Sequence, residues 1–276
     1  MKKTINIAGK IVSLENPLIM GIINVTPDSF HKDSRYSPFE EDFLQKAYEI
    51  IREGADILDI GGYSTRPNAE EVSVKEELER VIPTIKILKK HYPNVIISID
   101  TFRSVVAKEA IKNGAHIIND VSGGTLDNLM FETVIKLNVP YVLTHLRGNP
   151  KNMNEKTLYE DLIFDILNET FERANYLKRK GVKDIIIDPG FGFAKTLNQN
   201  YDLLKNLEVF KKFDLPILIG VSRKSMLYKY LNITPEESLN ATGQIHFLSL
   251  LKEANILRVH DIKAAKHTLQ LHKILY

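Results

Sequence analysis

The segment Asp184-Ile-Ile-Ile-Asp-Pro-Gly-Phe-Gly-Phe193 contains three consecutive isoleucines that end at an aspartate. Consecutive β-branched residues are typical of a strand that is buried on both faces. Pro189 cannot donate to a sheet ladder and Gly190 allows positive φ, so the chain must turn after Asp188. The segment therefore predicts a carboxylate at the carboxyl end of a buried strand, beside a glycine-rich loop. A carboxylate in that position is costly for a core and useful for a binding site.

Seven more apolar segments alternate with helical patterns along the chain. The eight predicted strands are residues 18–25, 56–60, 95–99, 116–118, 140–144, 184–188, 216–220 and 255–259. The predicted helices are residues 40–52, 74–91, 104–113, 126–138, 158–180, 198–213, 222–231, 235–253 and 262–275. Such alternation implies a parallel sheet, and eight units in 276 residues favour closure into a barrel. We therefore predict one α/β domain, residues 1–276, that is a (β/α)8 TIM barrel with a short N-terminal β-hairpin over residues 4–14.

Composition narrows the function classes. Lys and Arg number 37 against 35 Asp and Glu, and the net charge of +2 gives no indication of a nucleic-acid partner. The absence of cysteine excludes disulfides, thiolate zinc sites and cysteine nucleophiles, and fits a cytoplasmic protein. No apolar run approaches the ~18 residues of a membrane span, and the residues after Met1 lack the apolar core of a signal peptide.

Polar residues end most of the predicted strands. In (β/α)8 barrels the functional site forms at the carboxyl ends of the strands, whereas the barrel core favours branched apolar residues. These ends carry Asn24, Asp59, Asp100, Asn119, His145, Asp188, Ser222 and residues 258–260. The pattern predicts that these residues, although far apart in sequence, surround one mouth of the barrel.

Seven motifs at these strand ends together resemble the dihydropteroate synthases, folate-pathway enzymes that join a pterin to p-aminobenzoate. The motifs are Asn24-Val-Thr-Pro-Asp-Ser-Phe30, Asp59-Ile-Gly-Gly-Tyr-Ser-Thr-Arg-Pro67, Ser98-Ile-Asp-Thr101, Asn119-Asp-Val-Ser-Gly-Gly124, Asp188-Pro-Gly-Phe-Gly-Phe193, Gly220-Val-Ser-Arg-Lys224 and Arg258-Val-His-Asp261. The resemblance covers nearly the whole chain. It implies a transferase that acts on dihydropterin pyrophosphate and p-aminobenzoate, uses Mg²⁺ and forms a homodimer.

Asp188 alone is more often a turn residue than a ligand. Beside Asp100 and Asn119, it becomes part of a polar set suited to a flat heterocycle with several donors and acceptors. The resemblance implies substrate contacts by Asn119, Leu146, Asp188, Phe193, Gly220 and Lys224. It implies catalytic roles for Asp100, Lys224, Arg258 and His260.

Asp100 has two interpretations. As a structural residue it caps the helix predicted to begin at Ser104. As a functional residue it is a carboxylate close to a carbon that becomes cationic when pyrophosphate leaves. We favour the second, because electrostatic stabilisation of developing charge in a dry pocket is usually the largest catalytic contribution.

Arg258 and His260 flank Val259 at the end of the last strand, and residues two apart in a strand share a face. The structural alternative is an ion pair with Asp261. The resemblance favours binding of pyrophosphate, for which an arginine offers paired donors.

Two loops are predicted to cover the site. Residues 64–67 read as an ordinary turn, but the resemblance implies that Thr65 and Arg66 contact pyrophosphate and p-aminobenzoate. Residues 26–36 would close from the other side. Exclusion of water matters for a cationic intermediate.

Asn24 matches the magnesium-associated residue of the resembled family. One amide oxygen is a poor metal site, because Mg²⁺ completes its octahedron with phosphate oxygens and water. We predict weak Mg²⁺ binding until a diphosphate is present.

Residues 222–225, Ser-Arg-Lys-Ser, are predicted to open a helix with Ser222 as its N-cap. Basic residues in a first turn oppose the helix dipole, and a bound anion would resolve that conflict. The resemblance places the carboxylate of p-aminobenzoate near Ser222.

The chain departs from the family pattern in three places. The loop after the first strand lacks the usual glycine pair, Tyr63 replaces a glutamate, and Leu146 replaces a methionine. Histidines 31, 91, 116, 246, 267 and 272 are predicted to be solvated or packed, and His145 to be structural or pocket-lining. Two other functions remain open: a methyltetrahydrofolate corrinoid methyltransferase and a non-catalytic pterin-binding paralogue.

Overall fold

The computed structural model describes residues 3–25, 38–63 and 72–276. Its large sheet has eight parallel strands in the order β8-β7-β6-β5-β4-β3-β10-β9. The strands are β3 (Leu18–Asn24), β4 (Ile57–Gly61), β5 (Ile96–Asp100), β6 (Ile117–Asp120), β7 (Tyr141–Thr144), β8 (Ile185–Asp188), β9 (Leu218–Ile219) and β10 (Ile256–Val259). A parallel bridge between Ile187 and Ile217 joins the two ends of this order, and the Ile187 amide donates to Pro216 O at 2.8 Å. The predicted barrel is therefore confirmed.

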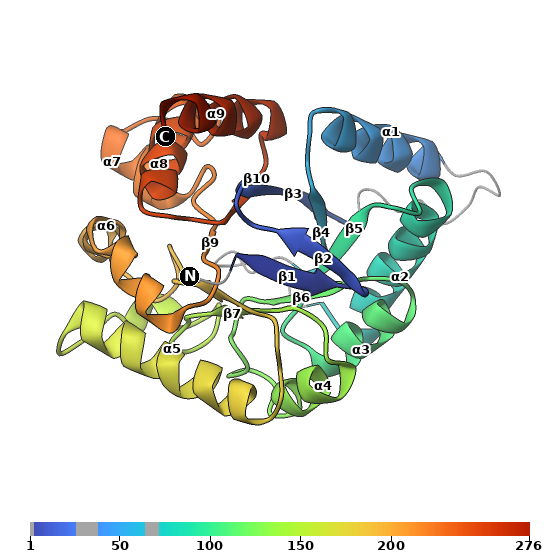
Figure 1. The fold of residues 1–276 in the computed structure, drawn as a ribbon, viewed down its shortest axis with the longest axis horizontal. Helices are drawn as coiled ribbons and strands as arrows, with labels where there is room; N and C mark the ends of the chain where they lie inside the picture. The colour runs from blue at the N-terminus through green and yellow to red at the C-terminus, as the bar shows by residue number, and fades with distance from the viewer. Residues whose placement is uncertain (1–2, 26–37, 64–71) are drawn as a thin grey trace.

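Helices surround the ring of strands (Figure 1). They are α1 (Pro38–Arg52), α2 (Val74–His91), α3 (Ser104–Lys112), α4 (Met130–Leu137), α5 (Leu162–Arg179), α6 (Leu197–Lys205), α7 (Ser225–Leu231), α8 (Leu239–Leu251) and α9 (Ile262–Leu275), with short 3-10 segments at Met153–Glu155 and Leu207–Phe213. The outward side chains of the strands form the main core with these helices, and Leu58, Ile99 and Ile187 belong to it. Among the described residues, no helix is long and apolar enough to cross a bilayer.

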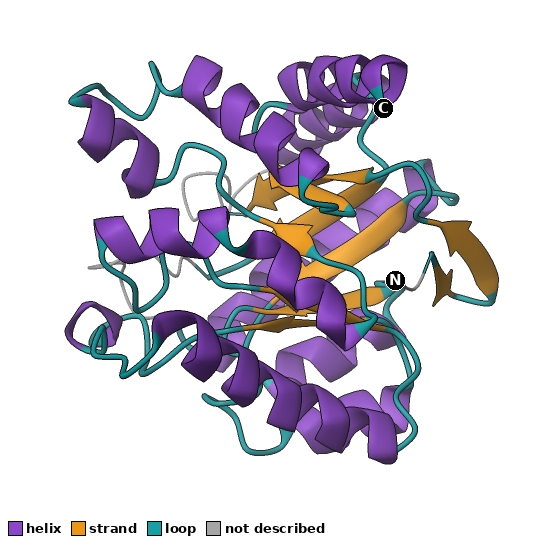
Figure 2. Ribbon diagram, turned by 60° about the vertical axis from the view of Figure 1, so that its left-hand side comes forward, coloured by secondary structure: helices purple, strands orange, loops and turns teal. Residues whose placement is uncertain are grey.

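The predicted N-terminal hairpin is confirmed as β1 (Thr4–Ile7) paired antiparallel with β2 (Lys10–Ser13). Ile5, Ile7 and Leu14 form a second buried cluster with inward residues at the amino ends of the barrel strands. The hairpin thus covers the amino end of the barrel (Figure 2). The hairpin does not cover the opposite end of the barrel, where the carboxyl ends of the strands lie.

Alternation along each strand separates an apolar layer from a polar one inside the barrel. The lower inward positions are Met20, Ile57, Ile96, Ile117, Val142, Ile186, Leu218 and Ile256. Two residues further along, on the same face, stand Asp59, Ser98, Asn119, Thr144, Asp188 and Arg258. The alternating pattern of the strands therefore places polar side chains above a filled apolar floor.

Several predicted helix boundaries are wrong. Residues 126–129 form turns, and α4 begins at Met130 rather than Leu126. The helix predicted over residues 198–213 ends at Lys205 and continues as a 3-10 segment. The α2 helix, in contrast, has the predicted bounds and runs through Pro83, and Ser73 and Glu76 form a capping box at its start.

Candidate active site

Three polar residues and a glycine from four adjacent strands lie in one register at the carboxyl end of the barrel. Asn24 pairs with Gly61, Gly61 with Asp100, and Asp100 with Asn119. A Cβ added to Gly61 would lie 3.6 Å from Asn24 Oδ1 and 3.7 Å from Asp100 Oδ2. The side chains of Asn24 and Asp100 therefore lie on either side of Gly61.

Arg258 on β10 forms hydrogen bonds to two carboxylates of the polar layer. Its Nε donates to Asp59 Oδ2 at 2.7 Å, and its Nη2 donates to Asp100 Oδ2 at 2.5 Å. Asn119 Nδ2 donates to the same Asp59 oxygen at 2.9 Å. Burial raises the pKa of Asp100, while the charge of Arg258 opposes that shift. The predicted alternative partner of Arg258, Asp261, instead accepts two hydrogen bonds from Arg223.

Asp188 ends β8 and Lys224 follows β9, the neighbouring strand at the barrel closure, so the two charged groups lie on the same side of the mouth. Burial raises the pKa of Asp188 and lowers that of Lys224 to about 8, and the attraction between the two groups opposes both shifts. The Gly190 amide donates to Asp188 Oδ1 at 2.8 Å. Lys224 Nζ donates to Phe191 O and lies 4.5 Å from the ring centroid of Phe193. Carboxylate, ammonium and aromatic ring thus form one wall that suits a flat polar heterocycle.

The predicted helix start at Ser222 is wrong. The α7 helix begins at Ser225, and the residue before it, Lys224, is in extended conformation and makes no side-chain capping bond. Arg223 adopts φ +52°, which a non-glycine residue seldom does and which the sequence pattern does not reveal. Ser222 is nevertheless next to the other anion-binding candidate, since its Oγ lies 3.1 Å from Nδ1 of His260 and accepts from the His260 amide at 3.2 Å.

The remaining predicted contact residues lie at different depths. Leu146 is buried against Met153 and Ala194, with Phe193 packed on the same small cluster. Gly220 is buried, and a Cβ there would lie 4.0 Å from Arg258 Cβ. Thr65 and Arg66 lie outside the described residues, as do the predicted loops 26–36 and 64–67.

Asn24 is an exposed residue on the rim of the mouth. Within residues 3–25, 38–63 and 72–276, no group of three or more His, Asp or Glu side chains could hold a metal ion by itself. A single amide oxygen in register with Asp100 fits Mg²⁺ that takes most of its ligands from substrate and water.

Three buried polar atoms in the polar layer have no hydrogen-bond partner among the described residues. They are Asp59 Oδ1, Ser98 Oγ and Thr144 Oγ1, each from a different strand. Buried polar atoms are rarely left unpaired, because desolvation without a compensating bond is costly. Their position favours a polar ligand or water in the barrel mouth.

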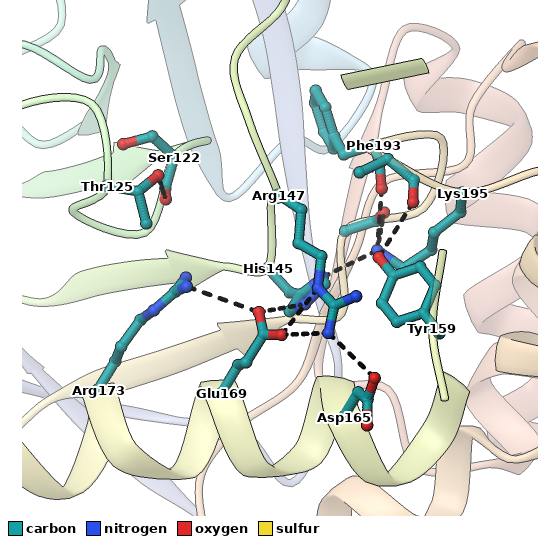
Figure 3. Close-up of polar contacts among 12 residues, drawn as sticks. Ser122, Thr125, His145, Arg147, Tyr159, Asp165, Glu169, Arg173, Phe193 and Lys195 are labelled. Atoms are coloured by element: carbon teal, nitrogen blue, oxygen red, sulfur yellow. Dashed lines mark hydrogen bonds and ion pairs between the residues drawn. The ribbon is translucent and has the colours of Figure 1, made fainter. Parts of the chain in front are cut away.

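Two groups of this region have no role in the prediction: Asp59 is predicted only to lie at the mouth, and Lys195 is not singled out. Asp59 is fully buried and holds both Arg258 and Asn119, and its sequence signal is an aspartate inside an apolar strand. Lys195 is 8% exposed and bonds to His145, which contacts Glu169 on α5 (Figure 3). The sequence feature that could have indicated Lys195 is its position directly after the glycine-rich loop segment Phe-Gly-Phe-Ala.

Comparison with known proteins agrees with this geometry. Residues 20–260 match the family model described as "Pterin binding enzyme". The Dihydropteroate synthase of Escherichia coli K12 is 40% identical over 257 residues, which cover 92% of this chain and 90% of that protein. The sulfonamide complex of the Yersinia pestis enzyme superposes with a TM-score of 0.90 at 36% identity, covering 99% of this chain and 98% of that one. The Xanthomonas albilineans enzyme with 4-aminobenzoic acid gives 0.89 at 34% identity, covering 100% and 98%.

The chain belongs to the pterin-binding enzyme family, whose fold it shares. Within that family the relatives named above are dihydropteroate synthases, and the function of this chain is that of this group of transferases.

Proposed function

We propose that the site condenses 6-hydroxymethyl-7,8-dihydropterin pyrophosphate with p-aminobenzoate by a dissociative displacement. The methylene C–O bond breaks and its electron pair leaves with pyrophosphate. The aryl amine then attacks the cationic carbon, forms the new C–N bond and releases a proton. The observation that carries this proposal is the division of one mouth into two walls: Asp188, Lys224 and Phe193 on one side, Arg258 and His260 on the other.

The first wall would bind the pterin. Asp188 has one oxygen occupied by the Gly190 amide and is 7% exposed, so its carboxylate can accept ring N–H groups in a dry setting. Asn119 on β6 supplies a side-chain amide to the same wall. The ring of Phe193 supplies a flat apolar surface. Pterins combine adjacent donors and acceptors with an aromatic face, which this wall complements.

The second wall would bind the leaving group and stabilise charge. Arg258 and His260 lie on the same face of the chain, and Ser222 contacts the imidazole of His260. Asp100 lies between this wall and the pterin wall, and its carboxylate would stabilise the cationic carbon. Asn24 would hold Mg²⁺, which when bound neutralises charge on the diphosphate.

The proposal extends to partners. We expect Thr65 and Arg66 to contact pyrophosphate and p-aminobenzoate, as the family resemblance implies. We also propose that the chain is one domain, acts in the cytoplasm and forms a homodimer. Exposed apolar side chains on α8 and α9, among them Leu251 and Leu271, support an interface there. Sedimentation equilibrium tests this, and a monomer at micromolar concentration would refute the dimer.

The decisive experiment measures pyrophosphate release with both substrates and Mg²⁺. We expect turnover in the wild type and a loss of at least about 100-fold in kcat for Asp100→Asn, because one transition-state interaction is removed. Asp202→Asn, an exposed carboxylate on α6, is the matched control and should match the wild type. Pterin binding without pyrophosphate release would refute the proposal and support a non-catalytic binding protein.

A further inference from the structure

Lys195 is a buried lysine outside the set of groups that face the proposed substrates. It follows the loop Gly190–Ala194 at the end of β8 and is 8% exposed. Its Nζ lies 2.9 Å from Gly190 O, 3.0 Å from Phe193 O and 3.0 Å from His145 Nδ1. An ammonium group has three N–H donors, and here each has one acceptor. The arrangement is therefore complete without any ligand contact by Lys195.

His145 connects this lysine to a charged cluster on α5. Burial lowers the pKa of His145 to about 3, with the nearby charge of Lys195 acting in the same direction, so the imidazole is neutral. Its Nε2 lies 3.2 Å from a Glu169 oxygen, and a neutral ring nitrogen beside a carboxylate must carry the proton. Nδ1 is then the acceptor that Lys195 requires.

Arg147 fixes the far end of this chain of contacts. Its Nε donates to Glu169 Oε1 at 2.8 Å, and its guanidinium carbon lies 4.0 Å from the ring centroid of Tyr159. The hydroxyl of Tyr159 donates to Ala194 O at 3.0 Å, so the cluster returns to the same loop (Figure 3). The remaining charged groups that act on Lys195 are Asp188 and Lys224. Burial lowers the pKa of Lys195 to about 7, and its three acceptors and Asp188 favour the charged form.

The loop that Lys195 holds has an unusual backbone. Gly190, Gly192 and Ala194 have φ of +75°, +80° and +50°. Such residues persist only where their surroundings fix them, especially Ala194, which has a Cβ. The same loop carries Phe193, supplies the carbonyl that Lys224 binds, and supplies the amide that binds Asp188. Every group of the pterin wall except Asn119 therefore depends on the shape of this loop.

We propose that Lys195 is a positioning residue for the pterin wall, held in place by His145 and Glu169, and that it sets pterin affinity without touching the pterin. The inference rests on the proposed function. It predicts a selective effect, because Arg258 and His260 of the pyrophosphate wall are anchored through Asp59, Asp100 and Ser222 and not through this loop.

Two binding measurements test it: fluorescence titration with 6-hydroxymethylpterin and calorimetric titration with inorganic pyrophosphate and Mg²⁺. For Lys195→Met we expect the pterin dissociation constant to rise at least tenfold and the pyrophosphate constant to change less than twofold. Lys108→Met, an exposed lysine on α3, is the matched control and should leave both constants unchanged. Lys195→Gln keeps two N–H donors and is used instead if Lys195→Met does not fold. For Lys195→Gln we expect a smaller rise in the pterin dissociation constant, again with less than a twofold change in the pyrophosphate constant.

Unchanged pterin affinity in a folded Lys195 variant would overturn the positioning role, as would equal weakening of both ligands. Neither outcome touches the proposed function, which fails only if the wild type binds no pterin or releases no pyrophosphate.

Discussion

Arg258 Nη2 lies 2.5 Å from Asp100 Oδ2, and the two residues are the last inward-facing groups of β10 and β5. The strands between them, β3 and β4, contribute Asn24 and Gly61 in register with Asp100. One ion pair therefore links the proposed pyrophosphate wall to Asp100, the proposed catalytic carboxylate.

Removal of this arginine should destabilise the protein as well as inactivate it. Arg258→Met leaves two buried carboxylates, Asp59 and Asp100, without their cation, and breaking a buried pair costs about 3–5 kcal/mol. Urea unfolding should show this loss, and Asp59→Asn added to Arg258→Met should recover part of it. Arg179→Met, at the exposed end of α5, is the control. A loss below about 1 kcal/mol would show that the carboxylates do not need Arg258.

Asp188→Asn should weaken pterin binding about ten- to hundredfold, since a hydrogen bond to a charged group contributes about 1.5–3 kcal/mol. Pyrophosphate binding should stay the same, because Asp188 lies on the other wall. Calorimetry with 6-hydroxymethylpterin measures the first value. Unaltered pterin affinity would remove Asp188 from the site.

Gly190→Ala should destabilise the fold by more than about 3 kcal/mol, because two penalties combine. Its φ of +75° disfavours any Cβ by about 1–2 kcal/mol, and the new Cβ would lie 2.0 Å from His145 O. Gly181→Ala separates the backbone penalty from the steric clash. Gly181 has a φ of +92°, but no atom lies within 4 Å of the new Cβ. Equal losses in the two variants, measured by urea unfolding, would exclude the clash with His145.

His246→Gln should reduce the acid sensitivity of the fold. Burial lowers the pKa of His246 to about 4, and only Asp261 opposes this shift. The pKa of a histidine in the unfolded chain is about 6.5. Between about pH 4 and 6.5, His246 is therefore protonated in the unfolded state but neutral in the folded state. Stability therefore rises with pH across that window, by up to about 1.4 kcal/mol per pH unit for one group. The variant should lose that part of the slope, and His267→Gln, exposed on α9, should keep it.

Mg²⁺ affinity should depend on the diphosphate. Titration of the protein alone should give weak binding, because Asn24 offers one amide oxygen. Addition of the pterin pyrophosphate should raise the affinity, and Asn24→Ala should reduce that gain. Tight binding of Mg²⁺ to the protein without substrate would contradict this.

Much of the barrel could be predicted from the sequence. Apolar segments that end at or near a polar residue identify most of the strands, and helical periodicity identifies most of the helices between them. The inward parity of Asp100, Asn119, Asp188 and Arg258 follows from the same alternation, which explains why the structure brings them to one mouth.

Two features could not be predicted, for different physical reasons. The start of α7 depends on the left-handed backbone of Arg223, a conformation that arginine does not signal in a sequence. The Lys195 cluster depends on contacts with backbone carbonyls and with His145, 50 residues away, which only the closed barrel brings together.

The hairpin of β1 and β2 has a kinetic consequence. By packing Ile5, Ile7 and Leu14 against the inward residues at the amino ends of the strands, it leaves the carboxyl ends as the side from which ligands would reach the proposed site. Under the proposed function, we therefore expect the more deeply bound reactant to enter first and the more deeply bound product to leave last.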